Sequence, residues 1–185
     1  MKIVTSNQKK LGEFRRLLQD NSITAALGLD LKEVASDDPI TVIKYKCLAA
    51  GEGCVVEDTV LEIDGECVTD IRYKLSELQD RSTPSRLSWI TTLGLITNGT
   101  LSVYQGVILG DFKPCPILPN DAFGFDPYFK PDGSDSTLYE LELLGDKDLY
   151  SARHKAITAL KNGSRLLALP ISEIPPWTGA WQNEE

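Results

Sequence analysis

Residues 2–18, KIVTSNQKKLGEFRRLL, decide the fold class of the chain. Residues 2–6 are typical of a short strand, and Asn7 after them is a favourable helix N-cap. Apolar side chains then recur at helical spacing, at Leu11, Phe14, Leu17 and Leu18. The stretch therefore predicts a strand, a turn and an amphipathic helix, as expected of an α/β protein.

The next elements continue this pattern. Asp38-Pro39 has the order of a helix N-cap followed by a proline at the first helical position, and the apolar stripe after it ends before Gly51. Cys54-Val55-Val56 is typical of a short buried strand, which delivers Glu57, Asp58 and Thr59 at its carboxyl end. Because open α/β sheets hold ligands at such strand ends, we expect a binding site there.

The rest of the chain predicts a helix, a hairpin and a final helix. Residues 71–80 suit a helix, and the β-branched and aromatic runs 87–96 and 100–109 flank Asn98-Gly99 as in a β-hairpin. A proline-containing loop leads to residues 123–127, and the last helix is expected over about Ser151–Lys161, closed by Gly163. No repeat or linker is visible, so we expect one domain over residues 1–185, in two lobes, with the tail from 170 unassigned.

Composition limits the classes of function. The 185 residues include 27 acidic and 19 basic ones, a formal net charge of −8, and the pI is near 4.7. This charge provides no general positive field for DNA or RNA, so a nucleic acid polymer is not an expected partner. A phosphate-bearing ligand would instead meet a few lysines and backbone amides gathered at one cleft.

Cysteine, histidine and hydropathy patterns point to a cytoplasmic protein. The four cysteines form no C-x-x-C pair, and with His154 as the single histidine there is no zinc-ligand spacing. No apolar signal segment precedes the first strand, and no stretch approaches the ~20 apolar residues of a membrane span. We expect reduced thiols, a cytoplasmic location and no membrane partner.

Thr5-Ser6-Asn7-Gln8-Lys9-Lys10 is the strongest local signal for a ligand. It places hydroxyls, an amide and two lysines where a strand meets a helix N-terminus, whose backbone N–H groups and partial positive charge attract anions. An ordinary N-cap with solvated lysines explains the same spacing equally well. The run is not a Walker loop.

Carboxylates and lysines farther along offer a second candidate site. Adjacent Glu57 and Asp58 could hold Mg²⁺ beside phosphates, although an Asp-Thr pair also suits a turn or a helix cap. Glu33 is either a second metal carboxylate or a solvated loop residue. Lys44 and Lys46 flank the apolar stripe of the second helix at similar angles, so helical geometry does not decide which one turns toward a cleft.

Two segments suit a planar base. Residues 123–127, Phe-Gly-Phe-Asp-Pro, combine aromatic faces, a glycine that permits close backbone approach and a carboxylate; a structural hydrophobic turn is the alternative. Lys147, Ser151 and Arg153 bracket the start of the last helix, as donors to base oxygens or phosphates or as a surface charge cluster.

Taken in order, these segments resemble the inosine triphosphatase (Ham1-like) family, with its T-G-N-x-x-K, D-[ST], F-G-[WY]-D-P and K-x-x-x-S-H-R motifs. The likeness runs from residue 1 to about 165. It implies a mixed β-sheet with flanking helices forming two lobes around a nucleotide cleft. It also implies Mg²⁺-dependent hydrolysis of non-standard purine nucleoside triphosphates, such as those of inosine and xanthosine or another modified base, to monophosphate and pyrophosphate.

The resemblance also assigns roles to residues. Phosphates would be bound by Thr5, Ser6, Asn7, Lys10, Lys46 and Thr59, with Lys46 preferred to Lys44 because Lys46-Cys47-Leu48-Ala49 fits the family's helix register. Glu33 and Asp58 would hold Mg²⁺, and Asp58 would be the catalytic base. The base would be framed by Phe123, Gly124, Phe125, Asp126, Lys147 and Arg153.

Several positions depart from the family pattern. Ser-His-Arg is here Ser151-Ala152-Arg153, and His154 lies about 200° around an ideal helix from Ala152, so it does not replace the imidazole. Phe125 keeps an aromatic face without a polar tip. We therefore expect an altered base preference.

Two further points stay open at this stage. The family's L-P-G loop is absent between Asp64 and Ser88, so a homodimer is left open. A nucleotide-binding protein without turnover is the second hypothesis, and retention of Asp58, Glu33, Lys10 and Lys46 argues against it.

Overall fold

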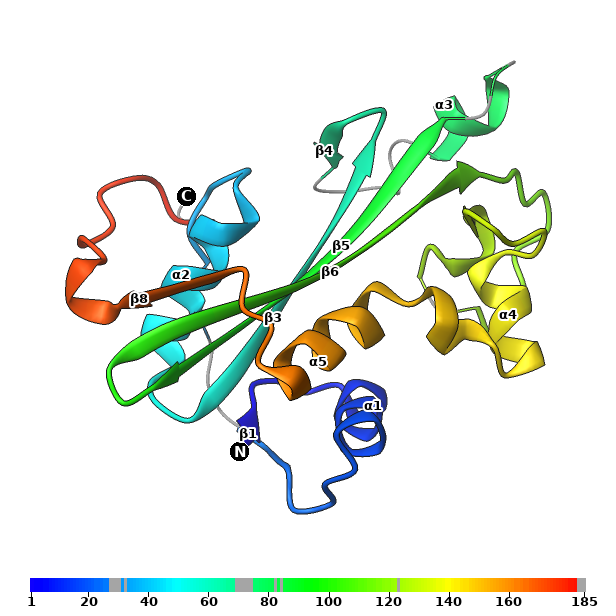
Figure 1. Ribbon diagram of the computed structural model, residues 1–185. Coiled ribbons are helices and arrows are strands. Elements are labelled where there is room, and N and C mark those ends of the chain that lie inside the picture. Colours follow the sequence, from blue (N-terminus) through cyan, green and yellow to red (C-terminus); the bar gives the residue numbers. More distant parts are fainter. Residues whose placement is uncertain are drawn as a thin grey trace. The chain divides into compact units, whose positions relative to one another are not determined.

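The computed structural model describes residues 1–26, 31, 33–68, 75–81, 83, 85–122 and 124–182 (Figure 1). In chain order its elements are β1 (Lys2–Ile3), α1 (Gln8–Leu18), β2 (Thr24–Ala25), α2 (Pro39–Ala50), β3 (Cys54–Ile63), β4 (Glu66–Val68), α3 (Leu75–Asp80), β5 (Arg86–Thr97), β6 (Thr100–Phe112), η2 (Asp126–Tyr128), β7 (Phe129–Pro131), α4 (Leu138–Leu144), η3 (Lys147–Tyr150), α5 (Ala152–Asn162), β8 (Leu167–Pro170) and η4 (Ile171–Glu173). The predicted α/β class is confirmed.

The strands are hydrogen-bonded in the order β2-β1-β3-β5-β6-β7, with β4 beside β3 and β8 beside β6. β1 runs parallel to both neighbours, since Lys2 lies opposite Thr24 on β2 and opposite Cys54 on β3. β6 runs antiparallel to both β7 and β8. The mixed sheet that the family resemblance implies is therefore present.

The chain forms two compact units. Unit 1 comprises Met1–Thr59, Thr91–Gly106 and Lys155–Glu185, and unit 2 comprises Val60–Ile90 and Val107–His154. Strands β3, β5 and β6 contribute residues to both units. None of the helices in the described part of the chain has the length and apolar character needed to cross a membrane.

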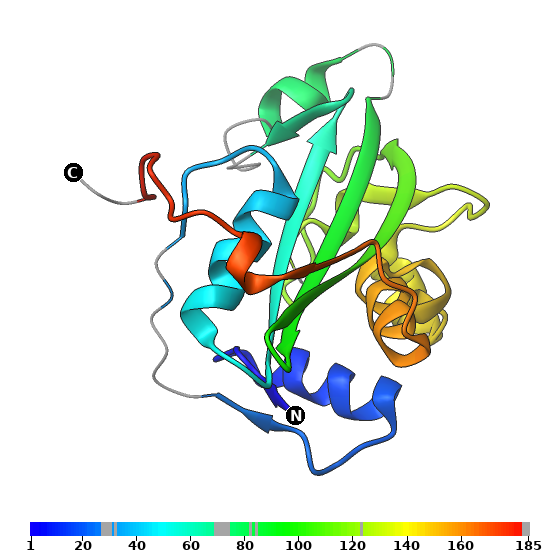
Figure 2. The same cartoon turned by 60° about the vertical axis from the view of Figure 1, so that its left-hand side comes forward.

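Unit 1 has an apolar cluster on each side of its strands. One cluster joins β3 to α1 and includes Phe14 and Val55, and the other joins β3 to α2 and includes Ile43 and Val56. Figure 2 shows α2 on one side of these strands and α1 on the other. Adjacent residues Val55 and Val56 enter different clusters because side chains alternate between the two faces of a strand.

Helices α1 and α2 of unit 1 begin where their capping residues predict. Asn7 accepts hydrogen bonds from the backbone N–H groups of Lys9 and Lys10, and Asp38 accepts them from Ile40 and Thr41. Pro39 takes the first helical position, where its missing N–H costs no hydrogen bond. The strand, turn and helix at the start of the chain and the capped second helix are confirmed.

The hairpin is also confirmed, but the end of β3 is a correction. Asn98 and Gly99 both have positive φ, 50° and 70°, as a tight hairpin turn between β5 and β6 requires. β3 does not end at Val56: it continues to Ile63, because its second half pairs with β4. The prediction that Glu57, Asp58 and Thr59 follow a strand end was therefore wrong, since all three lie inside the strand.

Two other predicted elements need comment. The helix expected over 71–80 is α3, which begins at Leu75, and residues 71–74 lie outside the described chain. The tail that the sequence left unassigned adds β8 to the edge of β6, with Thr100 opposite Pro170, and then forms η4. Beyond η4 the chain returns to α2. Figure 1 shows this last part of the chain in red, near α2.

Candidate functional site

The loop from Thr5 to Lys10 connects β1 to α1. The side-chain oxygen of Asn7 accepts hydrogen bonds from the N–H groups of Lys9 (2.9 Å) and Lys10 (3.3 Å). The N–H of Asn7 in turn donates to Oγ1 of Thr5 at 3.0 Å, and Ser6 is exposed. The loop thus has the geometry of a capped helix N-terminus, where backbone dipoles favour negative charge.

Lys10 and β3 together form the first charged cluster. The ammonium of Lys10 lies 2.8 Å from Oε1 of Glu57, whose side chain is only 4% exposed, whereas that of Lys10 is 30% exposed. Thr59 donates a long hydrogen bond to the same Glu57 oxygen and lies 3.4 Å from the hydroxyl of Thr91 on β5. The lysine therefore has a fixed carboxylate partner and still reaches solvent.

Lys46 is the centre of the second charged cluster. Its Nζ lies 2.7 Å from Oδ1 of Asp58 and 2.9 Å from Oε1 of Glu33, while its side chain is only 8% exposed. Burial lowers the pKa of Lys46, but attraction to Asp58 and Glu33 outweighs this effect and raises the pKa above its ordinary value. Lys46 is therefore a firmly charged ammonium held between two carboxylates.

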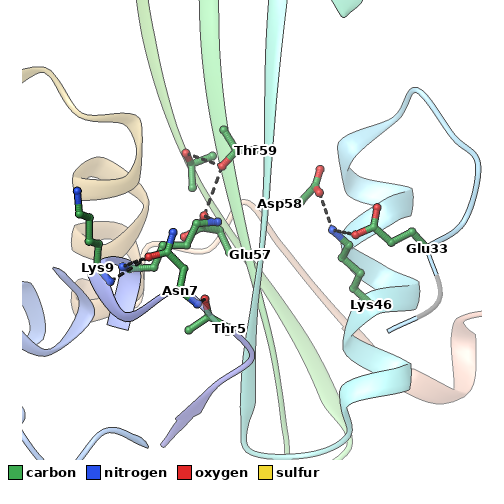
Figure 3. A network of polar contacts seen from close by, with 10 residues as sticks. Thr5, Asn7, Lys9, Glu33, Lys46, Glu57, Asp58 and Thr59 are labelled. Atoms are coloured by element: carbon green, nitrogen blue, oxygen red, sulfur yellow. Dashed lines mark hydrogen bonds and ion pairs between the residues drawn. The ribbon is translucent and has the colours of Figure 1, made fainter. Parts of the chain in front are cut away.

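The two clusters lie on opposite faces of β3. Figure 3 shows Asp58 pointing toward Lys46 and Glu33, whereas Glu57 and Thr59 point to the side of Asn7 and Lys9. This division follows from the alternation of side chains along a strand. The expectation that these two carboxylates form one site at a strand end is therefore corrected. Glu57 pairs with Lys10 of α1, and Asp58 pairs with Lys46 of α2.

Lys46, rather than Lys44, contacts Asp58. Both lysines lie on α2, but Lys46 is buried against β3 whereas Lys44 is partly exposed. The partner on β3 thus distinguishes two positions that the helix alone left equivalent. Glu57 was expected beside Asp58 as a metal carboxylate, whereas it pairs with Lys10. Thr91 was missed as a site residue. Strand alternation would have placed Glu57 beside Thr59 on the α1 face.

The Lys46 cluster has the donor chemistry of a magnesium site. Within the described residues, no group of three or more His, Cys, Asp or Glu side chains is arranged to hold a metal ion. The carboxylates of Glu33 and Asp58 nevertheless converge on a single cation, the ammonium of Lys46. Two convergent carboxylates fit Mg²⁺, which takes its other ligands from phosphate oxygens and water.

In unit 2, Asp126 and Lys147 form a buried ion pair. Nζ of Lys147 lies 2.6 Å from Oδ2 of Asp126 and 3.1 Å from Oε2 of Glu142. Burial raises the pKa of Asp126 above its ordinary value, and the positive charges of Lys147 and Arg153 oppose this rise without cancelling it. Burial lowers the pKa of Lys147, but Asp126 and Glu142 more than compensate, so the pKa is raised.

The aromatic turn is part of the core of unit 2. Phe125 is buried, and its ring packs against Tyr128 at a centroid distance of 5.4 Å and against Phe112 at 6.1 Å. Gly124 has a positive φ of 55°, which glycine adopts without strain, and Phe123 lies outside the described residues. For Phe125, the structural hydrophobic turn is the arrangement found.

The final helix presents a different set of side chains from the family motif. Ala152, at the position of the family's histidine, is buried in the apolar cluster of unit 2. Nδ1 of His154 is buried without a hydrogen-bond partner in the described chain, while its backbone N–H donates to Oγ of Ser151. The expectation that His154 does not replace the missing imidazole stays a prediction.

Comparison with known proteins identifies the family of the chain. The sequence profile of the Ham1 family matches residues 1–163. The chain belongs to the Ham1 family. Among similar proteins, a dITP/XTP pyrophosphatase of Nocardia farcinica is 26% identical over 189 residues, covering 85% of this chain and 91% of its own. One of Flavobacterium johnsoniae is 27% identical over 186 residues, covering 86% and 96%.

A solved structure supports the fold of this Ham1-family protein. The Staphylococcus aureus Ham1 protein superposes with a TM-score of 0.70 at 20% identity, over 89% of this chain and 98% of the other. At this identity the likeness shows a shared fold. The predicted family and architecture are therefore confirmed.

Proposed function

We propose that this Ham1-family protein is a nucleoside triphosphate pyrophosphatase that removes non-standard purine nucleotides from the nucleotide pool. The proposal takes as substrates the ribo- or deoxyribonucleoside triphosphates of inosine, xanthosine or another modified base, and gives a monophosphate and pyrophosphate. Family membership and the names of the similar proteins support the class of reaction. The observation that carries the proposal is the convergence of Glu33 and Asp58 on Lys46.

The phosphates would be bound by two lysines and a helix N-terminus. Lys10 is partly exposed, so its ammonium can reach a phosphate while Glu57 keeps it in place. Lys46 would supply the second positive charge, and Thr5, Ser6, Asn7 and Thr59 would supply hydrogen bonds. These local charges matter because the chain as a whole is acidic.

Glu33 and Asp58 would hold Mg²⁺, which when bound would neutralise charge on the triphosphate and on the departing pyrophosphate. Asp58 would orient a water molecule toward the α-phosphorus and accept its proton on a carboxylate oxygen. The water oxygen forms a bond to the α-phosphorus as the bond from that phosphorus to the bridging oxygen breaks. Lys10 and Lys46 would stabilise the charge that builds up on the leaving group.

The base would be recognised by residues of the aromatic turn and of the stretch that leads into the last helix. Asp126, Lys147 and Arg153 supply acceptor and donor groups, and Gly124 permits close backbone approach. Phe123 and Phe125 are proposed to frame the base. Phe125 is buried, so it would act by holding the turn in place. Because Ala152 lacks the hydrogen-bonding imidazole of the family motif, the base preference is expected to differ from that for inosine.

The decisive experiment measures pyrophosphate release from a panel of standard, deaminated and modified nucleoside triphosphates, with Mg²⁺ and with chelator. We expect metal-dependent release from one or a few of them. Nucleotide binding without release from any member of the panel would instead favour a binding protein that lacks turnover.

A further inference from the structure

The last described segment, Pro175–Gln182, lies beyond the part of the chain that the family profile matches, and it contacts the stretch that carries Glu33. Trp181 and Val34 form an antiparallel bridge. On one side of it, the N–H of Ala35 donates to the carbonyl of Ala180 at 3.0 Å. On the other, the N–H of Gln182 donates to the carbonyl of Glu33 at 2.7 Å.

The same segment also contacts the helix that carries Lys46. The hydroxyl of Tyr45 donates to the carbonyl of Pro175 at 2.8 Å, and the rings of Tyr45 and Trp177 lie 5.1 Å apart. Trp177 also forms a hydrogen bond within the segment, because its indole N–H donates to the carbonyl of Ala180 at 2.9 Å. A side chain on Gly179 would collide with this indole ring.

These contacts bear on Glu33 because little else in the described chain fixes it. Glu33 belongs to none of the described helices and strands, and its side chain is 41% exposed. A carboxylate in such a place loses conformational entropy when it joins an ion pair or binds a cation. Backbone bonds on both sides of Val34 reduce that loss by holding the main chain before any ligand arrives.

We propose that Trp177 and Gln182 are positioning residues that hold Glu33 opposite Asp58 and Lys46, and so set the affinity of the site for Mg²⁺. This inference rests on the proposed function for the identity of the cation. The segment contacts the surroundings of both Glu33 and Lys46. The N–H of Gln182 holds the backbone of Glu33, and the ring of Trp177 packs against Tyr45, the residue next to Lys46. Neither side chain contacts the substrate in this proposal.

The test compares Trp177→Ala with Trp177→Phe and Gln182→Pro with Gln182→Ala. Trp177→Phe keeps an aromatic ring beside Tyr45, and Gln182→Ala keeps the backbone N–H that proline removes. We expect Trp177→Ala and Gln182→Pro to weaken Mg²⁺ binding, measured by calorimetry, on the order of tenfold, as loss of groups that orient metal ligands typically does. The two conservative variants should stay close to the wild type, as should kcat at saturating Mg²⁺.

A double variant shows whether the effect passes through Glu33. In a Glu33→Gln background, Trp177→Ala should cause little further loss of Mg²⁺ affinity, because the carboxylate that it positions is already gone. Independent, additive losses would overturn the inference. So would a lower Tm or kcat with Mg²⁺ affinity unchanged, which would mean that the segment only stabilises the fold.

Calorimetry also separates this inference from the proposed function. If the wild type binds Mg²⁺ with the expected pattern among variants but releases no pyrophosphate, the reaction is wrong and the positioning role stands. If the wild type hydrolyses nucleotides while the variants bind Mg²⁺ unchanged, the reaction stands and the positioning role is wrong. Absence of Mg²⁺ binding by the wild type would overturn the positioning role, while pyrophosphate release alone decides the proposed function.

Discussion

Lys46 of α2 and Asp58 of β3 form an ion pair with 2.7 Å between Nζ and Oδ1, and both side chains are largely shielded from solvent. The pair joins a helix to the middle of a strand, so each group has its position set by regular backbone. Glu33 completes the arrangement from a third segment. Such a charged trio depends on all of its members, because loss of one leaves another without its counter-charge.

Replacement of Asp58 by asparagine should remove turnover while leaving nucleotide binding measurable. The amide keeps the size of the side chain but can neither accept the proton of water nor bind a cation as well. We expect kcat to fall by about 100-fold or more, within the range of a lost general base. Pyrophosphate release gives the rate and calorimetry gives the binding. Asp111→Asn, in a surface pair with Arg86, is the matched control, and unchanged turnover in Asp58→Asn would sink the assignment.

Lys46→Met and Lys44→Met should differ sharply although the two lysines are one half-turn apart on the same helix. Loss of Lys46 removes a phosphate ligand and leaves Asp58 and Glu33 facing each other, so kcat/KM should fall on the order of 100-fold. Lys44→Met should stay within about twofold of wild type, since surface substitutions usually have small effects. Steady-state kinetics with one triphosphate substrate decides, and equal losses would contradict the role of Lys46.

Ala152→His should raise kcat/KM for inosine triphosphate relative to other purine triphosphates if the missing imidazole accounts for the altered preference. The same change should lower stability, because Ala152 is buried and added volume in a packed core costs about 1–3 kcal/mol. Ala152→Leu adds comparable bulk without a donor, so it should lose stability and gain no activity. Competition between substrates and thermal unfolding measure the two effects; no change in preference would count against this base pocket.

The pH dependence of stability should carry the signature of Asp126. Its pKa is raised on folding above the ordinary value of 3.8 by burial, with Lys147 opposing the shift. The folded state therefore binds the proton more tightly, so this stabilising contribution is complete below pH 3.8 and is lost as the pH rises through the raised pKa. The difference in unfolding free energy between wild type and Asp126→Asn should decline across that window in urea titrations. A difference that grows with pH would contradict the shift.

Local signals predicted the elements that local interactions determine. Asn7, Asp38-Pro39 and Asn98-Gly99 each fix a helix start or a turn through neighbouring residues, and each was found as expected. The end of β3 was misjudged because pairing with β4 extends the strand past its apolar run. That partner could not be inferred from Cys54-Val55-Val56 alone.

Sequence patterns did not predict the parts of the site that depend on contacts between residues far apart in the chain. Lys44 and Lys46 are equivalent by helical spacing, and the family resemblance alone favoured Lys46. The contact with Asp58 on β3 distinguishes them in the structure. The segment around Gln182 had no visible role because its partner, Val34, lies 148 residues earlier. As a sequence motif, the turn with Phe125 suits stacking on a base and packing in a core equally well. In the structure Phe125 lies in the apolar cluster of unit 2.

The alternation along β3 also bears on how this strand tolerates insertions and deletions. Moving the strand by one position so that Glu57 takes the place of Asp58 would also bring Val56 to the place of Glu57. Lys46 would still meet a carboxylate, one methylene longer, whereas Lys10 would meet a valine. The opposite shift would bring Asp58 to Lys10 and Thr59 to Lys46, so no shift of one residue keeps both ion pairs and the two lysines together select the register of the strand.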